Sequence, residues 1–285
     1  MAPRIANILG HYIYLTVEGD EYRVYYEEAG SGTPILMQHT AGTDSRQFRH
    51  VVEDPELASQ FRMVAYDLPY HGRSLPPVGR EWWKEEYALH QDFLMKFVVA
   101  LADALGMDKA IFMGCSMGGH LAPDLALHYP GVFRAVIAIE GGLATHDAEP
   151  FNKYLFHPRC SNEMKAALMI TQTSPRSPEA LRRETGWVYS QGAPSVFKGD
   201  VVYYLVEHDL TETARDIDTS RTAVHVLSGD YDWSATPERC LALADAIPGA
   251  TYTRMEGIGH FPMSEDPNAF MKYLRPLLAE IVSAS

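Results

Sequence analysis

Residues 110–119 read AIFMGCSMGG, and this stretch decides the fold. The apolar run before Gly114 predicts a buried strand, and the apolar pattern of residues 121–129 predicts a helix. Gly114 and Gly118 stand two residues before and two residues after Ser116, where small residues let the strand and the helix approach closely. The stretch therefore predicts a strand, a sharp turn and a helix, with Ser116 exposed above the end of the strand.

Similar apolar runs recur along the chain, separated by helical patterns. They span residues 34–37, 61–66, 110–113, 135–139 and 223–227. Strands that are apolar on both faces are typical of a parallel sheet covered by helices, so we predict a doubly wound α/β sheet. Before them, residues 11–18 and 22–28 predict two strands joined by a turn at Gly19. Helices are predicted over residues 84–105 and 266–282, with Pro276 kinking or ending the second.

One long stretch breaks this alternation of strands and helices. Residues 141–221 contain no good strand, but they hold several prolines, short helical patterns and many aromatic residues. A segment this long inside a compact domain is typically a functional insertion. We therefore predict one sheet domain formed by residues 1–140 and 222–285, with residues 141–221 inserted as a helical lid.

The composition is that of a globular chain with an acidic charge. Of its 285 residues, 46% are hydrophobic and 21% are charged, and 24 basic against 37 acidic residues give a net charge of −13. Nucleic acid and anionic membranes are therefore poor partners, and no apolar run is long enough to span a bilayer. The scattered cysteines, Cys115, Cys160 and Cys240, predict neither a disulfide framework nor a metal site. Because residues 1–10 lack a signal-peptide pattern, we expect a cytoplasmic protein that needs no metal or cofactor.

Ser116 is the predicted nucleophile, and a serine hydroxyl needs a base held in register. His260, within GIGHFP at residues 257–262, is the predicted base because it comes last in the order serine, acid, histidine. The acid is expected in SGDYDW, residues 228–233, directly after a predicted strand. Asp232 lies far enough round that turn to face the histidine loop, so we predict it as the acid. Asp230 stays the alternative, as a turn residue that satisfies local amides.

Backbone amides have to hold the negative charge that develops on a carbonyl oxygen. One is predicted to be the N–H of Met117, next to the nucleophile. The other is expected from QHTAG, residues 38–42, where the N–H of Ala41 is our choice and that of Thr40 the alternative. Glu140, at the end of another predicted strand, is interpreted as a salt bridge or an anchor of the lid, and His120 as helix packing.

A second motif resembles a known family. Residues 66–74, YDLPYHGRS, resemble the D-x-P-G-H-G-x-S turn of the α/β-hydrolase superfamily, in its capped esterase, lactonase and peroxidase-like branch. The similarity covers about residues 10–140 and 222–282. It implies the α/β-hydrolase fold, with a mostly parallel eight-stranded sheet flanked by helices, and structural roles for Asp67 and His71. The chain departs from the family at Thr40 and Tyr70, where glycine is usual.

Together these residues predict a serine hydrolase that forms an acyl-enzyme on Ser116 and cleaves a carboxylic ester or a lactone. The lid aromatics favour a medium-sized apolar or aromatic small molecule, and the predicted pocket residues are Thr40, Tyr154, Trp187, Trp233 and Phe261. Three alternatives stay open: carbon–carbon bond hydrolysis of a diketone or ring-cleavage product, cofactor-free perhydrolysis, and a small-molecule receptor on the same fold. We expect no nucleic-acid or membrane partner, and we keep a homodimer open.

Overall fold

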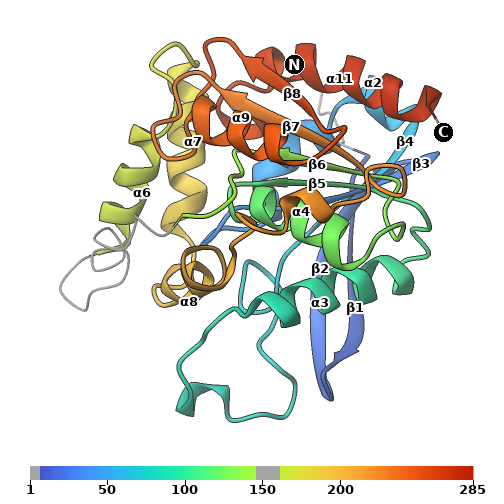
Figure 1. Ribbon diagram of the computed structural model, residues 1–285. Helices are drawn as coiled ribbons and strands as arrows, with labels where there is room; N and C mark the ends of the chain where they lie inside the picture. The colour runs from blue at the N-terminus through green and yellow to red at the C-terminus, as the bar shows by residue number, and fades with distance from the viewer. Residues whose placement is uncertain (1–6, 146–160, 285) are drawn as a thin grey trace.

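The computed structural model describes residues 7–145 and 161–284, and its centre is one eight-stranded sheet (Figure 1). The strands are β1 (Leu9–Val17), β2 (Asp20–Gly30), β3 (Thr33–Gln38), β4 (Phe61–Tyr66), β5 (Ile111–Cys115), β6 (Ala135–Ile139), β7 (Ala223–Gly229) and β8 (Thr251–Met255). Their order across the sheet is β1-β2-β4-β3-β5-β6-β7-β8. The β1–β2 and β2–β4 pairs are antiparallel, and the other neighbours are parallel. The predicted mostly parallel, eight-stranded sheet is confirmed.

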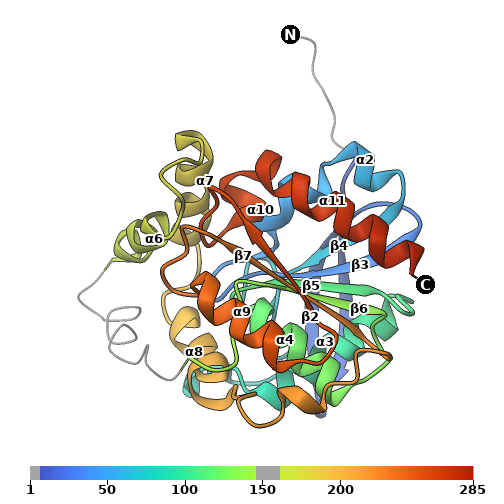
Figure 2. The same ribbon diagram turned by 45° about the horizontal axis from the view of Figure 1, so that its top comes forward.

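Helices cover both faces of the sheet (Figure 2). One face carries α3 (Gln91–Ala104), α4 (Met117–His128) and α9 (Pro237–Ala246); the other carries α1 (Arg49–Val52), α2 (Pro55–Ala58), α10 (Pro262–Glu265) and α11 (Pro267–Ser283). Alternate side chains of β5 divide between two apolar cores. Phe112 packs in the core that includes Leu94 of α3, whereas Ile111 and Met113 pack in the core that includes Phe270 of α11. Burial of both faces explains why these strands are apolar throughout.

The described residues between β6 and β7 are largely helical. The described elements are α6 (Asn162–Thr171), α7 (Glu179–Ser190), α8 (Val196–Val202), the π-helical turn η4 (Tyr203–Glu207) and the 3-10 turn η5 (Ala214–Asp216). In both views α6, α7 and α8 lie beside one edge of the sheet (Figures 1 and 2). We call residues 141–221 the lid, and their standing as an inserted unit remains our prediction.

Two helices differ from the prediction. Helix α3 begins at Gln91 rather than near residue 84, where the structure has only the 3-10 turn η2 (Trp82–Lys84). The lid fixes this start, because the N–H of Leu89 donates to the carbonyl oxygen of Gly199 at 3.0 Å and that of Gln91 to Glu207 at 2.7 Å. Helix α11 continues through Pro276 to Ser283, so of the two predicted outcomes the early end is wrong, whereas the kink stays a prediction. Pro276 lies on the exposed side, where water solvates the carbonyl that loses its partner.

The carboxyl ends of the central parallel strands meet at one edge of the sheet. The register pairs Gln38 with Gly114, Gly114 with Ala138 and Ile139 with Leu227. The loops that leave this edge therefore carry the candidate residues from four separate parts of the chain. In open α/β sheets this edge is the usual place for a ligand.

Candidate active site

Ser116 occupies the turn between β5 and α4 in a strained backbone conformation. Its φ is 55° and its ψ is −112°, values that a residue with a side chain rarely adopts. The N–H of Ser116 donates to the carbonyl oxygen of Ile139 at 2.8 Å, which ties the turn to the end of β6. Such strain persists only where surrounding contacts enforce it, and it concentrates at functional sites.

Three glycines make this turn sterically feasible. A Cβ on Gly114 would lie 2.3 Å from the carbonyl oxygen of Gly118. A Cβ on Gly118 would lie 2.8 Å from atoms of Gln38, and one on Gly119 would lie 2.2 Å from the carbonyl oxygen of Ile139. The glycine spacing in the sequence thus reflects close approach of α4 to the ends of three strands.

His260 and Asp232 form a buried pair close to that turn. His260 Nδ1 lies 2.5 Å from Asp232 Oδ2. The other carboxylate oxygen, Oδ1, accepts from the N–H of Ser234 at 2.8 Å and from its hydroxyl at 2.9 Å. Burial raises the pKa of Asp232, but His260 and the Ser234 hydrogen bonds outweigh it, so the pKa lies below its ordinary value. Asp232 is therefore ionised at neutral pH, and its charge faces the imidazole.

The competing carboxylate, Asp230, points elsewhere. Its Oδ1 accepts from the N–H of Gly257 at 2.7 Å, and its own N–H donates to the carbonyl oxygen of Met255. Asp230 therefore joins β7 to the loop that precedes His260. The structure brings Asp232 and not Asp230 to the imidazole.

Glu140, at the end of β6, is a second buried carboxyl beside this pair. Its Oε1 accepts from the N–H of Gly229 at 2.6 Å, and its carboxyl is within hydrogen-bonding reach of Asp232. Burial and the neighbouring Asp232 raise the pKa of Glu140 well above its ordinary value. Glu140 is therefore a buried carboxyl that binds Gly229 beside Asp232, and not the expected salt bridge or lid anchor.

We expect Glu140→Gln to stabilise the protein more at pH 8 than at pH 5. An amide keeps the acceptor for Gly229 and a donor for Asp232, but it carries no ionisable proton. The pKa of Glu140 is raised in the folded protein. The contribution of Glu140 to folding stability is therefore fully present only below its pKa in the unfolded chain, about 4.3, and is lost as the pH rises. Between the unfolded pKa and the raised folded-state pKa, each pH unit adds up to about 1.4 kcal/mol to the difference in unfolding free energy between Glu140→Gln and the wild type. Urea unfolding at both pH values measures it, with Glu256→Gln on an exposed turn as the control. Equal differences at the two pH values would mean that Glu140 stays ionised.

We call residues 39–44, the loop after β3, the β3 loop. Its backbone N–H groups differ in whether they are already hydrogen-bonded within the protein. The N–H and the hydroxyl of Thr40 both donate to Gln47 Oε1, at 3.0 and 3.1 Å. The N–H of Gly42 donates to Asp200 Oδ2 at 2.6 Å. Ala41 lies between these two occupied amides and lines the cavity that holds Ser116. The arrangement favours Ala41 over Thr40 as the amide presented to a ligand.

A cavity of about 330 Å³ opens beside Ser116 and His260. The lid supplies an apolar wall formed by Leu168, Met169, Tyr189, Phe197, Tyr204 and Leu205. Polar side chains of Glu140, Gln172, Thr236 and Arg239 lie elsewhere on the lining. A cavity with one apolar wall and a few polar groups is the usual form of a small-molecule site.

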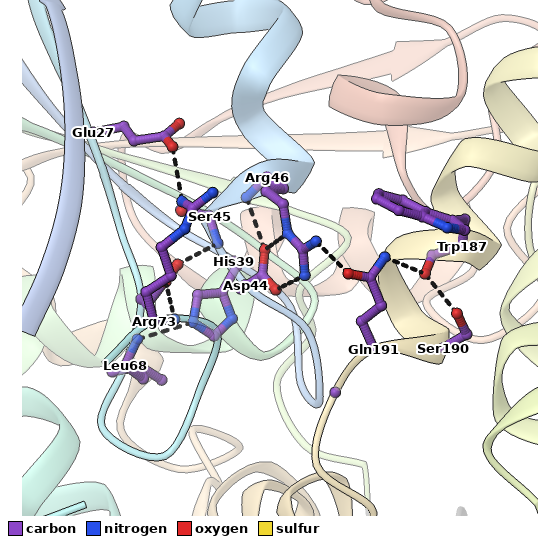
Figure 3. A network of polar contacts seen from close by, with 12 residues as sticks. Glu27, His39, Asp44, Ser45, Arg46, Leu68, Arg73, Trp187, Ser190 and Gln191 are labelled. Carbon is purple, nitrogen blue, oxygen red and sulfur yellow. Dashed lines mark hydrogen bonds and ion pairs between the residues drawn. The ribbon is translucent and has the colours of Figure 1, made fainter. Parts of the chain in front are cut away.

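Not all of the predicted pocket residues line the cavity. Trp233 lines the cavity. Trp187 does not: it is 59% exposed, and the Arg46 guanidinium lies 5.6 Å from its ring. Figure 3 shows Trp187 beside Ser190 and Gln191, which both donate to its carbonyl oxygen. Phe261 and Thr40 are buried behind the cavity wall, where Phe261 packs against Tyr189 and Thr40 binds Gln47. Tyr154 lies outside the described residues.

His120, interpreted from the sequence as helix packing, also lines the cavity. This residue lies one helical turn after Ser116, and its ring stacks on Tyr204 with the centroids 5.8 Å apart. Its Nδ1 is 3.1 Å from the backbone N of Gly142. Burial and the neighbouring His208 lower the pKa of His120 well below its ordinary value, so the ring is neutral. Its position on α4 was the available signal, because residues four apart on a helix lie on the same face.

Within residues 7–145 and 161–284, no cluster of three histidine, cysteine, aspartate or glutamate side chains is arranged to hold a metal ion. In the same part of the chain, no helix has the length and apolar character needed to cross a bilayer. Cys115 and Cys240 are both buried.

Known proteins share this fold. Residues 33–159 match the family model of the α/β hydrolase fold. An uncharacterized hydrolase of Saccharomyces cerevisiae is 31% identical over 157 residues, which cover 53% of this chain and about half, 51%, of the yeast protein. A thermophilic esterase from Thermogutta terrifontis has a TM-score of 0.82 and 20% identity, with 95% of this chain and 99% of that chain covered. The enol-lactonase from Burkholderia xenovorans LB400 has a TM-score of 0.78 and 23% identity, with 94% and 100% covered.

The chain has an eight-stranded α/β sheet and a serine on the tight turn between β5 and α4. This combination is typical of hydrolases with the α/β-hydrolase fold. The chain has the α/β-hydrolase fold that its motifs predicted, and residues 33–159 match the family model of that fold.

Proposed function

We propose that this protein is a serine hydrolase that cleaves a carboxylic ester or a lactone through an acyl-enzyme. One observation carries the proposal: Ser116 and His260 line the same cavity, and Asp232 holds the far side of the His260 ring at 2.5 Å. Nucleophile, base and orienting acid thus come from three loops at one edge of the sheet, in the chain order that this fold uses.

In the proposed mechanism Ser116 Oγ attacks the carbonyl carbon while His260 Nε2 takes its proton. Asp232 binds the Nδ1–H of His260, which leaves Nε2 unprotonated and stabilises the imidazolium that forms. The N–H groups of Met117, at the start of α4, and of Ala41 would hold the oxyanion. His260 then protonates the leaving alcohol oxygen. Water, activated by the same imidazole, releases the acid and restores Ser116.

The cavity supports a medium-sized substrate with an apolar or aromatic part. Its volume of about 330 Å³ and the aliphatic and aromatic lid wall suit an enclosed small molecule rather than a polymer. The net charge of −13 argues against nucleic acid as a partner. The similarity to an esterase and to an enol-lactonase supports both ester and lactone as candidate bonds.

A fluorophosphonate probe tests this proposal because it phosphonylates only an activated serine. We expect one adduct, located at Ser116 by peptide mass spectrometry, and loss of ester turnover in step with labelling. A p-nitrophenyl ester, a lactone and a β-diketone assayed side by side then identify the bond. No adduct, or an adduct on another residue, contradicts the proposed nucleophile. Turnover of the diketone alone contradicts ester hydrolysis.

A further inference from the structure

The lid contacts the β3 loop on both sides of Ala41. Before Ala41, the hydroxyl of Tyr189 on α7 contacts the hydroxyl of Thr40. After it, Asp200 on α8 accepts from the N–H of Gly42 at 2.6 Å. These contacts join residues 149 and 158 positions apart, so they exist only when the lid is seated on the sheet.

Asp200 is a buried carboxyl group whose two oxygens are both held by hydrogen bonds. Its side chain is fully buried, and Oδ2 also accepts from His71 Nε2 at 2.9 Å. Its other oxygen, Oδ1, accepts from the hydroxyl of Tyr87 at 2.9 Å. Burial lowers the pKa of His71, but the charge of Asp200 and the hydrogen bond to it outweigh burial, so the pKa is raised and the protonated ring is favoured. Charge-assisted hydrogen bonds of this kind are stronger than neutral ones, and they fix the carboxylate relative to the sheet.

Close packing accompanies the hydrogen bond at Gly42. This residue has a φ of +68°, and a Cβ there would lie 2.3 Å from the Phe197 ring of α8. On the other side, a Cβ on Gly192 of the lid would lie 2.4 Å from the carbonyl oxygen of Gly42. At Gly192 the lid backbone therefore touches the backbone of the β3 loop directly, and at Gly42 the loop packs against the Phe197 ring. These contacts leave little room for the loop to shift.

The two peptide groups that flank Ala41 are held by different parts of the molecule. The carbonyl oxygen of Thr40 lies 2.8 Å from His39 Nδ1. The other ring nitrogen, His39 Nε2, accepts from the N–H of Leu68 (Figure 3). His39 thus donates through Nδ1 and orients the peptide that contains the N–H of Ala41, because the two ends of a planar trans peptide point oppositely. The next peptide, between Ala41 and Gly42, is oriented by Asp200. His39 in the core and Asp200 in the lid therefore together fix the orientation of the backbone around Ala41.

We propose that Asp200 is a positioning residue: by binding the N–H of Gly42 it aims the Ala41 amide, and the oxyanion site is complete only when the lid is seated. This inference rests on the proposed function. Asp200 does not line the cavity that holds Ser116. Its loss should therefore weaken transition-state binding and leave binding of the planar substrate almost unchanged.

The test compares Asp200→Ala, Asp200→Asn and Tyr87→Phe, using p-nitrophenyl butyrate as substrate and a trifluoromethyl ketone that forms a tetrahedral adduct with serine. Asp200→Ala is expected to lower kcat about 100-fold, the cost of a misplacement near 1 Å, with KM within about threefold. The inhibition constant of the ketone should rise by a similar factor. Asp200→Asn keeps a neutral acceptor for Gly42, so we expect a partial loss of about tenfold in both quantities.

Tyr87→Phe is the matched control, because it removes the bond to Oδ1 of the same carboxylate and leaves Gly42 untouched. We expect it to change kcat less than about threefold. If Asp200→Ala fails to fold, Asp200→Asn tests the inference instead: its kcat should fall and the inhibition constant of the ketone should rise by a similar factor. Losses confined to KM, an unchanged inhibition constant, or an equal loss in Tyr87→Phe would overturn the inference. Failure of the proposed function looks different, because the wild-type protein would then neither label at Ser116 nor bind the ketone.

Discussion

Replacing Ser116 by alanine is expected to lower kcat for ester hydrolysis about 10⁴- to 10⁶-fold, the largest effect of any single substitution in this chain. The substitution removes one oxygen atom from the turn. It leaves the glycine contacts, the His260–Asp232 pair and the cavity wall in place. Substrate should still bind, so the loss should fall on kcat and not on KM. Steady-state hydrolysis of a p-nitrophenyl ester, with ligand binding measured separately, checks both parts.

Ser234 provides a matched control for this substitution. Its hydroxyl lies 3.2 Å from His260 Nδ1 and also donates to Asp232, so it is a second serine beside the same imidazole. It contacts the wrong ring nitrogen for a nucleophile, because Nδ1 already faces Asp232. We expect Ser234→Ala to cost less than about tenfold in kcat. Full turnover by Ser116→Ala, or a greater loss in Ser234→Ala, would contradict the proposed nucleophile.

Local contacts explain why the turn at Ser116 could be predicted from the sequence. The strand, the glycines and the helix follow one another within residues 110–129, and the steric reason for each glycine lies in backbone atoms close to the turn. The same holds for the sheet, whose strands are apolar because both faces are covered. The placement of Asp232 at the imidazole follows a similar logic, since the turn after β7 has only two carboxylates to offer.

The lid side of the cavity could not be predicted in this way. Trp187 and Leu168 both lie on lid helices, yet one is 59% exposed and the other lines the cavity. Which face of each helix turns inward depends on packing between segments far apart in sequence. The bond between Gly42 and Asp200 is of that kind, as is the contact with Gly199 that delays the start of α3. Hydrophobic periodicity records that a face is buried, but it does not record what covers it.

Asp232→Asn is expected to lower kcat about 10⁴-fold while the fold is kept. The structure predicts how the new amide will sit. Because Oδ1 accepts from the N–H and the hydroxyl of Ser234, the amide oxygen should stay there. The NH₂ group then replaces Oδ2 and faces His260 Nδ1. A donor at that position forces the proton onto Nε2, and His260 can no longer accept the proton of Ser116.

Asp230→Asn is the control that separates the two carboxylates of this turn. Its oxygen accepts from the N–H of Gly257, a bond that an amide oxygen can also make, so we expect a change in kcat below about threefold. Rates of fluorophosphonate labelling should fall in parallel with kcat in Asp232→Asn, because both report the same activated serine. If Asp230→Asn shows the larger loss, the acid has been assigned to the wrong carboxylate. Because the two residues share one turn, a general disturbance of the loop after β7 would lower kcat in both variants alike. A loss in Asp232→Asn alone therefore reports the loss of the imidazole partner.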